Sequence, residues 1–394
     1  MRVAIIADDL TGAADTGVQL VRAGYRTAVA FRDAPIPPSE DLDAVALDTD
    51  SRTMPAGFAA RRVLAATRAV RATPLIYKKL DSTLRGPIAA ELSAALSASG
   101  REHAIVAPAF PAAGRTTVEG VQLVRGVPVH ETEAKDDPRT PVREGHLPTL
   151  LAAAFSSVEL LGVRDLADPS TVRRALEDAV CIVADATREE DLEALVRAVP
   201  NPYGVLWAGS AGLTVALGRV YPGPSAGEPL SAPAPARRVL VVVGSLSGVA
   251  RKQLRSLEEH GCAAAPVTLD RSGEALGPVR RALSRRTCAV LHSVEERDAS
   301  DAGAAVGVLS GVVDALSEEG LFDALVLTGG ETAVGVARRL GAVGIWLEGE
   351  LEPGIPVGRL IGPRPYGVIT KAGAFGEAGT LVAAVETLLK EREG

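Results

Sequence analysis

The chain has few cysteines, no excess of basic residues and no long apolar run, and each shortage excludes a class of protein. The three cysteines are odd in number and far apart, so neither a disulfide framework nor a CxxC metal site is available; they are Cys181, Cys262 and Cys288. We expect buried thiols in a reducing cytoplasm. The 49 acidic and 42 basic residues give a net charge of −7, which argues against a nucleic-acid partner.

Membrane-spanning and secretory segments are not predicted either. The longest uncharged stretch, residues 198–218, is interrupted by prolines and glycines and does not predict a membrane span. The first ten residues, MRVAIIADDL, reach acids after only five apolar residues, which is typical of a β-strand and not of a signal peptide. We therefore expect a cytoplasmic protein with no membrane partner, and 394 residues suggest two or three domains at about 150 residues each.

Several common catalytic motifs are absent as well. The chain has no Walker A motif and no GxGxxG, which excludes a P-loop enzyme and an evident Rossmann dehydrogenase, and no GxSxG elbow. The five histidines lack metal-ligand spacing, so the identity of any metal ligand stays unknown. Only His130 keeps our attention, because it adjoins an irregular segment, 131–148, that we interpret as an exposed loop or lid.

A repeated unit of apolar strand, glycine- or aspartate-containing turn and amphipathic helix runs through the chain. Examples are the expected strands 3–7, 74–78 and 239–243 and the expected helices 13–23 and 87–99. This repetition predicts an α/β protein with two α/β domains and mainly parallel sheets. The proline-rich stretch 222–236 predicts a stiff linker between a first domain, 1–221, and a second, 237–394, with the active site in the cleft between them.

Charged residues follow the expected strands of the first half. Ligands of open α/β sheets bind at the carboxyl ends of the strands, and Asp8 and Asp9 stand directly after the first one. Two such carboxylates could hold hydroxyls, orient Mg²⁺ or act as a base. The alternative is that one of them caps the next helix while the other faces solvent.

A denser cluster follows the expected strand 74–78. Lysines and an arginine surround a DST turn there, and Arg52 follows another strand end, which together predict a site for a carboxylate or a phosphate. Asp81 could instead be only a salt-bridge partner. We predict a substrate site made by Asp8, Arg52, Lys78, Lys79, Leu80, Asp81 and Arg85, with Asp8, Asp9 and Asp81 as candidate catalytic carboxylates.

The second half carries three glycine-rich turns after expected strands, at residues 244–248, 328–332 and 371–376. Small residues let the phosphates of a nucleotide approach backbone amides. A single turn of this kind is not diagnostic, but three in one half favour a nucleotide site. We predict nucleotide contacts from Ser245, Ser247, Gly329, Gly330, Glu331, Thr332, Gly373 and Gly376.

Five motifs together resemble the four-carbon acid sugar kinase family: ADDLTGAADTG (7–17), YKKLDSTLRG (77–86), GSLS (244–247), GGET (329–332) and KAGAFG (371–376). Their order is that of the family and they span nearly the whole chain. The resemblance implies an N-terminal domain for the sugar acid, a C-terminal domain for the nucleotide, and ATP-dependent phosphorylation at the terminal hydroxyl of threonate, erythronate or 3-oxo-tetronate. One departure is Ala374, where family members often have a second glycine.

The resemblance implies the same residues as the motifs: Asp8, Arg52, Lys78, Lys79 and Asp81 toward the substrate, and Ser245, Gly329, Gly330, Glu331, Thr332 and Gly373 toward ATP. ATP and Mg²⁺ are the expected cofactors, a sugar acid is the expected partner, and a homo-oligomer is left open. Two alternatives remain: a sensor that binds the sugar acid without catalysis, and a kinase of another small hydroxy acid or another phosphate-handling enzyme.

Overall fold

The computed structural model describes residues 1–38, 40, 42–228, 235–267, 272–285, 287–294 and 302–389. These residues form two compact units, which are treated separately below: an N-terminal unit, Met1–Arg32 with Pro38–Glu228, and a C-terminal unit, Asp33–Pro37 with the residues after Glu228. Residues 229–234 of the expected linker lie outside the described residues. Its first residues pack on the N-terminal unit, because the amides of Gly223 and Ser225 donate to the carbonyls of Ala23 and Gly24.

A parallel sheet of eight strands forms the centre of the N-terminal unit, in the order β2-β3-β1-β4-β11-β5-β10-β9. Continuous apolar runs form these strands because helices cover both faces; all five residues of β1, VAIIA, are buried. The strands are β1 Val3–Ala7, β2 Thr27–Ala30, β3 Ala44–Asp48, β4 Leu75–Lys79, β5 His103–Ala107, β9 Val158–Leu161, β10 Cys181–Ala184 and β11 Val205–Gly209.

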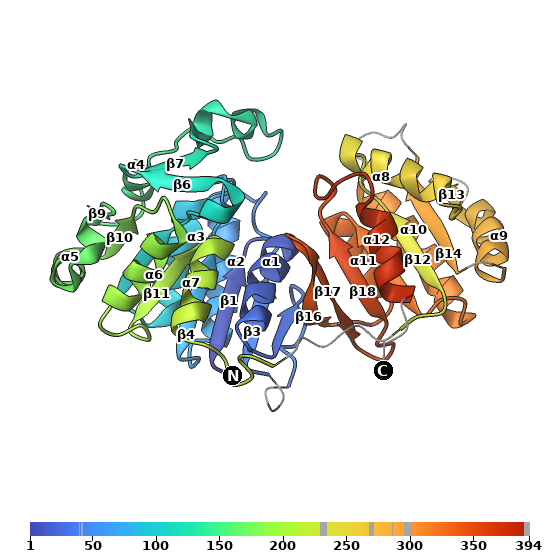
Figure 1. Cartoon of the computed structure of the whole chain (residues 1–394), viewed down its shortest axis with the longest axis horizontal. Coiled ribbons are helices and arrows are strands. Elements are labelled where there is room, and N and C mark those ends of the chain that lie inside the picture. The colour runs from blue at the N-terminus through green and yellow to red at the C-terminus, as the bar shows by residue number, and fades with distance from the viewer. Residues whose placement is uncertain are drawn as a thin grey trace. The chain divides into compact units, whose positions relative to one another are not determined.

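Helices α1, α7, α6 and α5 pack side by side in this unit, and α2 packs on α3 (Figure 1). Their bounds are α1 Leu10–Arg22, α2 Ala56–Ala69, α3 Ile88–Ser99, α4 Leu147–Leu151, α5 Pro169–Asp178, α6 Glu189–Ala198 and α7 Ala211–Val220. The expected strand 74–78 and helices 13–23 and 87–99 are therefore observed with shifts of at most three residues at their ends. Short 3-10 turns lie at η2 Pro111–Ala113, η3 Val129–Glu131, η4 Glu133–Asp136 and η5 Asp165–Ala167.

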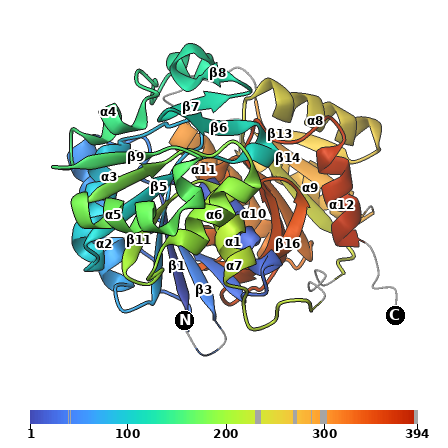
Figure 2. The same cartoon turned by 60° about the vertical axis from the view of Figure 1, so that its left-hand side comes forward.

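A small antiparallel sheet adds a feature that the sequence analysis did not predict. It consists of β6 Arg115–Val118, β7 Val121–Val124 and β8 Val127–Pro128, and it lies above the carboxyl ends of the large sheet (Figure 2). Its two turns, Glu119-Gly120 and Arg125-Gly126, have four positive φ angles, as tight hairpin turns require. The carboxylate of Asp185 holds the first turn through the amides of Glu119 and Gly120, at 2.7 and 2.9 Å.

The C-terminal unit has five parallel strands, β13-β14-β12-β15-β18, followed in the sheet by the antiparallel strands β17 and β16. The strands are β12 Val239–Val243, β13 Ala263–Val267, β14 Cys288–Ser293, β15 Ala324–Thr328, β16 Gly344–Glu352, β17 Ile355–Ile361 and β18 Gly367–Lys371. The helices are α8 Gly248–Glu259, α9 Ser272–Leu283, α10 Ala302–Glu318, α11 Gly330–Arg339 and α12 Thr380–Leu389. Two α/β units with mainly parallel sheets confirm the predicted fold class.

The predicted burial of the cysteines is partly wrong. Cys181 and Cys288 are buried, but Cys262 is half-buried because it lies just before the edge strand β13. Along the described ranges, no helix combines the length and the apolar character that crossing a bilayer would require.

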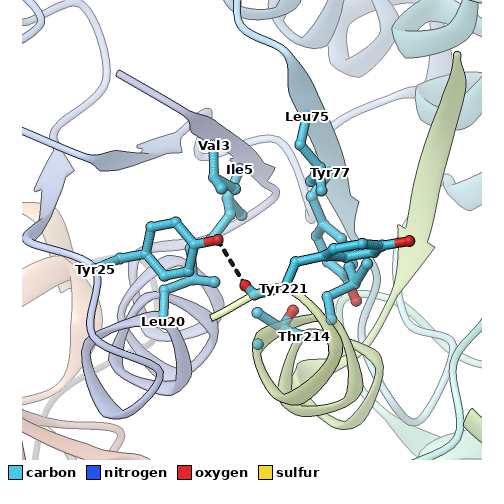
Figure 3. Close-up of a pocket in the computed structure, with 10 residues that line it drawn as sticks. Val3, Ile5, Leu20, Tyr25, Leu75, Tyr77, Thr214 and Tyr221 are labelled. Atoms are coloured by element: carbon cyan, nitrogen blue, oxygen red, sulfur yellow. Dashed lines mark hydrogen bonds between the residues drawn. The ribbon is translucent and has the colours of Figure 1, made fainter. Parts of the chain in front are cut away.

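A small apolar cavity of about 10 Å³ lies between α1, α7 and the strands β1 and β4 (Figure 3). The hydroxyl of Tyr25 donates to the carbonyl of Tyr221 at 2.7 Å across it. This volume holds at most about one water molecule, so the cavity is too small for a sugar acid.

Candidate active site

Acidic residues converge at the carboxyl edge of the N-terminal sheet. Asp8 follows β1, and Asp9 caps α1 by accepting the Gly12 amide at 2.7 Å. The neighbouring strand β3 ends at Asp48, which is in register with Ala7 of β1. The parallel register therefore brings the ends of β1 and β3 into one layer.

Arg52 binds both adjacent aspartates. Its Nε and Nη2 donate to the two oxygens of Asp8 at 2.7 and 2.9 Å, and its Nη1 and Nη2 donate to those of Asp9 at 2.5 and 2.9 Å. Nη2 also lies 3.9 Å from Asp81. Four charge-assisted bonds fix both carboxylates, and only one of the five guanidinium N–H groups is not used by them.

Asp81 and Arg85 extend this arrangement from β4 toward α3. Arg85 donates to Asp81 through Nε at 2.8 Å and Nη2 at 3.1 Å, and the Thr83 hydroxyl donates to the same carboxylate at 2.5 Å. Arg85 also lies 3.6 Å from Asp137, which belongs to the segment that we interpreted as a loop or lid. We call Asp8, Asp9, Arg52, Asp81 and Arg85 the Arg52 cluster.

The two adjacent lysines of β4 have different surroundings. The ammonium of Lys78 is fully buried, lies 2.8 Å from Glu91 of α3 and donates to the Lys79 carbonyl, so its charge is neutralised inside the fold. Lys79 is 3% exposed and bonds only the Leu80 carbonyl, at 2.8 Å. Among the residues that the structure describes, no carboxylate lies within 4 Å of the Lys79 ammonium, although its charge acts on Asp8, Asp9 and Asp81 from farther away.

The carboxylates at this edge have pKa values that are shifted in opposite directions. Burial opposes the ionisation of Asp8, but Arg52, Lys78 and Lys79 together hold its pKa below the ordinary value. Burial likewise opposes ionisation of Asp81, and Arg52, Arg85 and Lys79 bring its pKa well below the usual range.

The other two aspartates shift the opposite way. Burial and the nearby charge of Asp8 raise the pKa of Asp9 despite Arg52, although its side chain is 29% exposed against 4% for Asp8. Burial, aided by Asp9 and Asp50, raises the pKa of Asp48 to about 7. Asp9 is thus the accessible carboxylate of the Arg52 cluster with the greatest affinity for a proton.

Two loops beside the Arg52 cluster hold non-glycine residues in the left-handed region. Asp50 has φ 46°, and Leu84, which is buried, has φ 58°. Such conformations cost on the order of 1–3 kcal/mol and concentrate at functional sites. They show that the surrounding structure fixes the two loops that present Arg52 and Arg85.

The remaining predicted residue of the first half, Leu80, has its side chain in the core at 1% exposure, so only its backbone is available at the edge. Asp48 was missed by the sequence analysis as a site residue. Its position directly before the Thr49–Arg52 loop and after an apolar strand was the signal that could have found it.

The three glycine-rich turns of the C-terminal unit meet at the ends of β12, β15 and β18. The hydroxyl of Ser247 caps α8 and donates to the Gly373 carbonyl at 2.6 Å. A side chain on Gly373 would overlap the Ser245 hydroxyl, and one on Gly244 would overlap the hydroxyl of Thr332. The turns therefore touch one another only because these positions lack side chains.

Gly329 gives the second turn its shape. Its φ of 101° is unfavourable for any residue with a side chain, and it forms the N-cap of α11 without a side-chain hydrogen bond. Gly330 and the exposed Glu331 open the first turn of that helix. Gly376 also has a positive φ, but it packs against Thr380, so its conformation serves the turn before α12.

The sequence analysis placed Lys371 in the third turn and in the KAGAFG motif but did not select it as a nucleotide contact; it is the last residue of β18. It is 3% exposed and stands in register with Thr328 of β15, at the point where the turns meet. Its position at a strand end directly before a glycine-rich turn was the available signal.

Comparison with known proteins identifies the family. A family model described as "Sugar-binding N-terminal domain" matches residues 3–217, and one described as "Nucleotide-binding C-terminal domain" matches residues 240–381. The chain belongs to the four-carbon acid sugar kinase family. This confirms the resemblance on which the sequence analysis relied.

Two relatives of this family member carry the name D-threonate kinase. The protein from Salmonella typhimurium is 36% identical, with 98% of each chain covered, and that from Bordetella bronchiseptica is 37% identical, with 99% of this chain and 98% of the relative covered. A solved structure from Bordetella bronchiseptica, described as a domain-swapped dimer with bound citrate, is 34% identical over 100% of both chains, with a TM-score of 0.51.

Proposed function

We propose that this family member is an ATP-dependent kinase that phosphorylates the terminal hydroxyl of a four-carbon sugar acid, D-threonate first among them. In this proposal the Arg52 cluster and Lys79 hold the acid, and the three glycine-rich turns hold ATP. The observation that carries the proposal is the double engagement of Arg52 by Asp8 and Asp9. A polyhydroxy acid needs fixed carboxylates for its hydroxyls and a cation for its carboxylate, and this edge of the sheet supplies both.

The roles follow from charge and access. Lys79, a buried cation with no carboxylate within 4 Å among the described residues, suits the substrate carboxylate. Asp8 and Asp81 have lowered pKa values and stay ionised, so they accept hydrogen bonds from substrate hydroxyls. Asp9 is more accessible and has a raised pKa, so it is the best placed of the three predicted catalytic carboxylates to accept a proton.

The transfer itself is an in-line displacement. The terminal hydroxyl oxygen attacks the γ-phosphorus, the bond from that phosphorus to the β–γ bridging oxygen breaks, ADP leaves, and the hydroxyl proton passes to Asp9 and then to solvent. Positioning contributes more than base strength to such reactions, which suits a cluster whose carboxylates are already held by Arg52.

Mg²⁺ would enter with the nucleotide and neutralise charge on the phosphates. Along the described part of the chain no group of three His, Cys, Asp or Glu side chains could hold a metal by itself. Mg²⁺ is commonly bound by phosphate oxygens and one or two carboxylates, so a single carboxylate beside the glycine-rich turns would be enough. The exposed Glu331, at the start of α11, is the carboxylate that would serve.

The experiment is an ADP-release assay with ATP, Mg²⁺ and a panel of D-threonate, L-threonate, D-erythronate and 3-oxo-tetronate, with glycerate as the three-carbon comparison. Phosphorus NMR of the product then locates the phosphate, because a phosphate on a terminal CH₂ couples to two protons and one on an inner carbon couples to one. Turnover with a four-carbon acid supports the proposal. Binding of an acid without ADP release would favour the sensor, and turnover of glycerate alone would favour a different small-acid kinase.

The oligomeric state is part of the proposal. The domain-swapped dimer described for the solved structure from Bordetella bronchiseptica leads us to propose that this chain also forms a homodimer. Light scattering coupled to size exclusion would give twice the chain mass of 40.6 kDa for a dimer, and the single chain mass would refute it.

A further inference from the structure

Lys371 is buried where the three glycine-rich turns of the C-terminal unit meet. Parallel pairing aligns Val243 of β12 with Thr328 of β15, and Thr328 with Lys371 of β18. The carbonyl of Lys371 accepts the amide of Gly329 at 2.9 Å, which fixes its backbone between two of the turns. Its Nζ lies 3.5 Å from the carbonyl of Gly373, which the Ser247 hydroxyl also contacts.

This ammonium has no ionic partner within 4 Å among the residues described. The carboxylate of Glu352 influences it from farther away, but both oxygens of that carboxylate accept the Thr380 hydroxyl at 2.9 Å. Burial, opposed by Glu352, lowers the pKa of Lys371 to about 8, so the protonated form still dominates at pH 7. A buried cation without a counter-charge is costly unless a ligand supplies one.

The surroundings of Lys371 favour an anion. The carbonyl of Lys371 is bonded to Gly329, the N-cap of α11, and that helix starts without any side-chain hydrogen bond at its cap. The helix begins directly after β15, whose last residue Thr328 is paired with Lys371, so its N-terminus with the positive end of the dipole lies at the same strand edge as the lysine. A cation and uncapped amides at one strand edge suit phosphate oxygens.

We propose that Lys371 is a nucleotide-binding residue that holds the phosphate chain of ATP through its ammonium. This rests on the proposed function, in which ATP occupies the three turns. The negative phosphates pair with the Lys371 ammonium, which has no carboxylate within 4 Å among the described residues, while the glycine-rich turns donate hydrogen bonds from their amides. The lysine thereby contributes affinity for the phosphates and none for the nucleoside.

The test is nucleotide binding to the full chain by calorimetry, with ATP, ADP and adenosine as probes. Lys371→Met should weaken ATP and ADP binding by about 10- to 150-fold, the loss of one charge-assisted bond, and leave adenosine binding unchanged. Lys371→Arg, which keeps the charge, should recover most of the affinity. The matched control is Lys252→Met, an exposed lysine on α8 in the same unit, which should bind ATP as the wild type does.

The outcomes separate the inference from the proposed function. A wild-type protein that binds no ATP refutes the proposed function, whereas ATP binding that is equal in the wild type and Lys371→Met refutes only the role of Lys371. Equal losses for ATP and adenosine would also refute it, because they indicate a structural role. If melting curves show that the Met variant does not fold, Lys371→Gln, which keeps a polar head, replaces it in the same comparison.

Discussion

Replacement of Arg52 by alanine is the sharpest perturbation of the Arg52 cluster. The variant removes four hydrogen bonds to two neighbouring carboxylates. Asp8 then keeps only the more distant charges of Lys78 and Lys79 to offset its burial. We expect lower stability of the N-terminal unit, weaker sugar-acid binding and unchanged ATP binding.

The magnitude follows from burial. The side chains of Arg52 and Asp8 are 14% and 4% exposed, and removing one partner of a buried ion pair costs about 3–5 kcal/mol. The ion pair of Arg26 with Asp43 in the same unit has an arginine side chain that is 51% exposed, and pairs of that kind contribute about 0–1 kcal/mol. Substrate affinity should fall about 10- to 150-fold, because the aspartates that bind the hydroxyls lose their fixed positions.

The assay is urea unfolding followed by the fluorescence of Trp207, which is buried in β11 of the N-terminal unit, in a Trp346→Phe background that removes the other tryptophan. Arg26→Ala is the matched control, and isothermal titration with D-threonate and ATP gives the two affinities. Equal destabilisation by Arg52→Ala and Arg26→Ala would refute the energetic argument. A loss of ATP affinity with an intact acid affinity would refute the assignment of the two ligands.

Three further predictions follow from the same geometry. Gly329→Val should abolish ATP binding because φ is 101° there, while Gly320→Val, at φ 63° in open surroundings, should cost stability but not ATP binding; equal titrations of the two would contradict this. Asp9→Asn, which keeps a capable helix cap, should lower kcat by about 10²-fold with unchanged ATP affinity, and an unaltered kcat would exclude Asp9 as the proton acceptor. The pKa of Asp48 is raised to about 7, so the fold favours its protonated form. The free energy of unfolding therefore keeps the whole Asp48 contribution below about pH 4 and loses it as the pH rises to 7 and above. Asp48→Asn should therefore gain stability over the wild type between pH 5 and pH 8, by at most on the order of 4 kcal/mol in urea unfolding, and an equal difference at both pH values would oppose this.

The central strands were readable from the sequence because they are buried on both faces. Continuous apolar runs predicted β1 and β12 with the observed bounds, Val3–Ala7 and Val239–Val243. The hairpins were missed, although Glu119-Gly120 and Arg125-Gly126 between alternating apolar residues are a hairpin signal. The helix that was expected from residue 13 begins at Leu10, because Asp9 caps it directly after the strand.

The sequence alone also determined which residues stand at strand ends, since a polar or glycine-rich turn must follow each buried run. The motifs were sufficient to identify the family and to select Asp8, Arg52 and Asp81 as candidates. The pairing of Arg52 with both aspartates could not be predicted in this way, because the residues lie 43 and 44 positions apart and only the parallel register of β1 and β3 brings them together.

The tertiary structure alone determines how the surroundings of the two adjacent lysines of β4 differ. Successive side chains of a strand point to opposite faces of the sheet, and helices cover both faces, so the sequence presents Lys78 and Lys79 as equivalent cations. The fold places Glu91 of α3 against Lys78 as a direct ion-pair partner. Lys79 lies beside Gly12 of α1, and its charge acts on Asp8, Asp9 and Asp81 without a direct ion pair. Which of the two lysines keeps a charge for the substrate was thus decided by the helix that packs on each face.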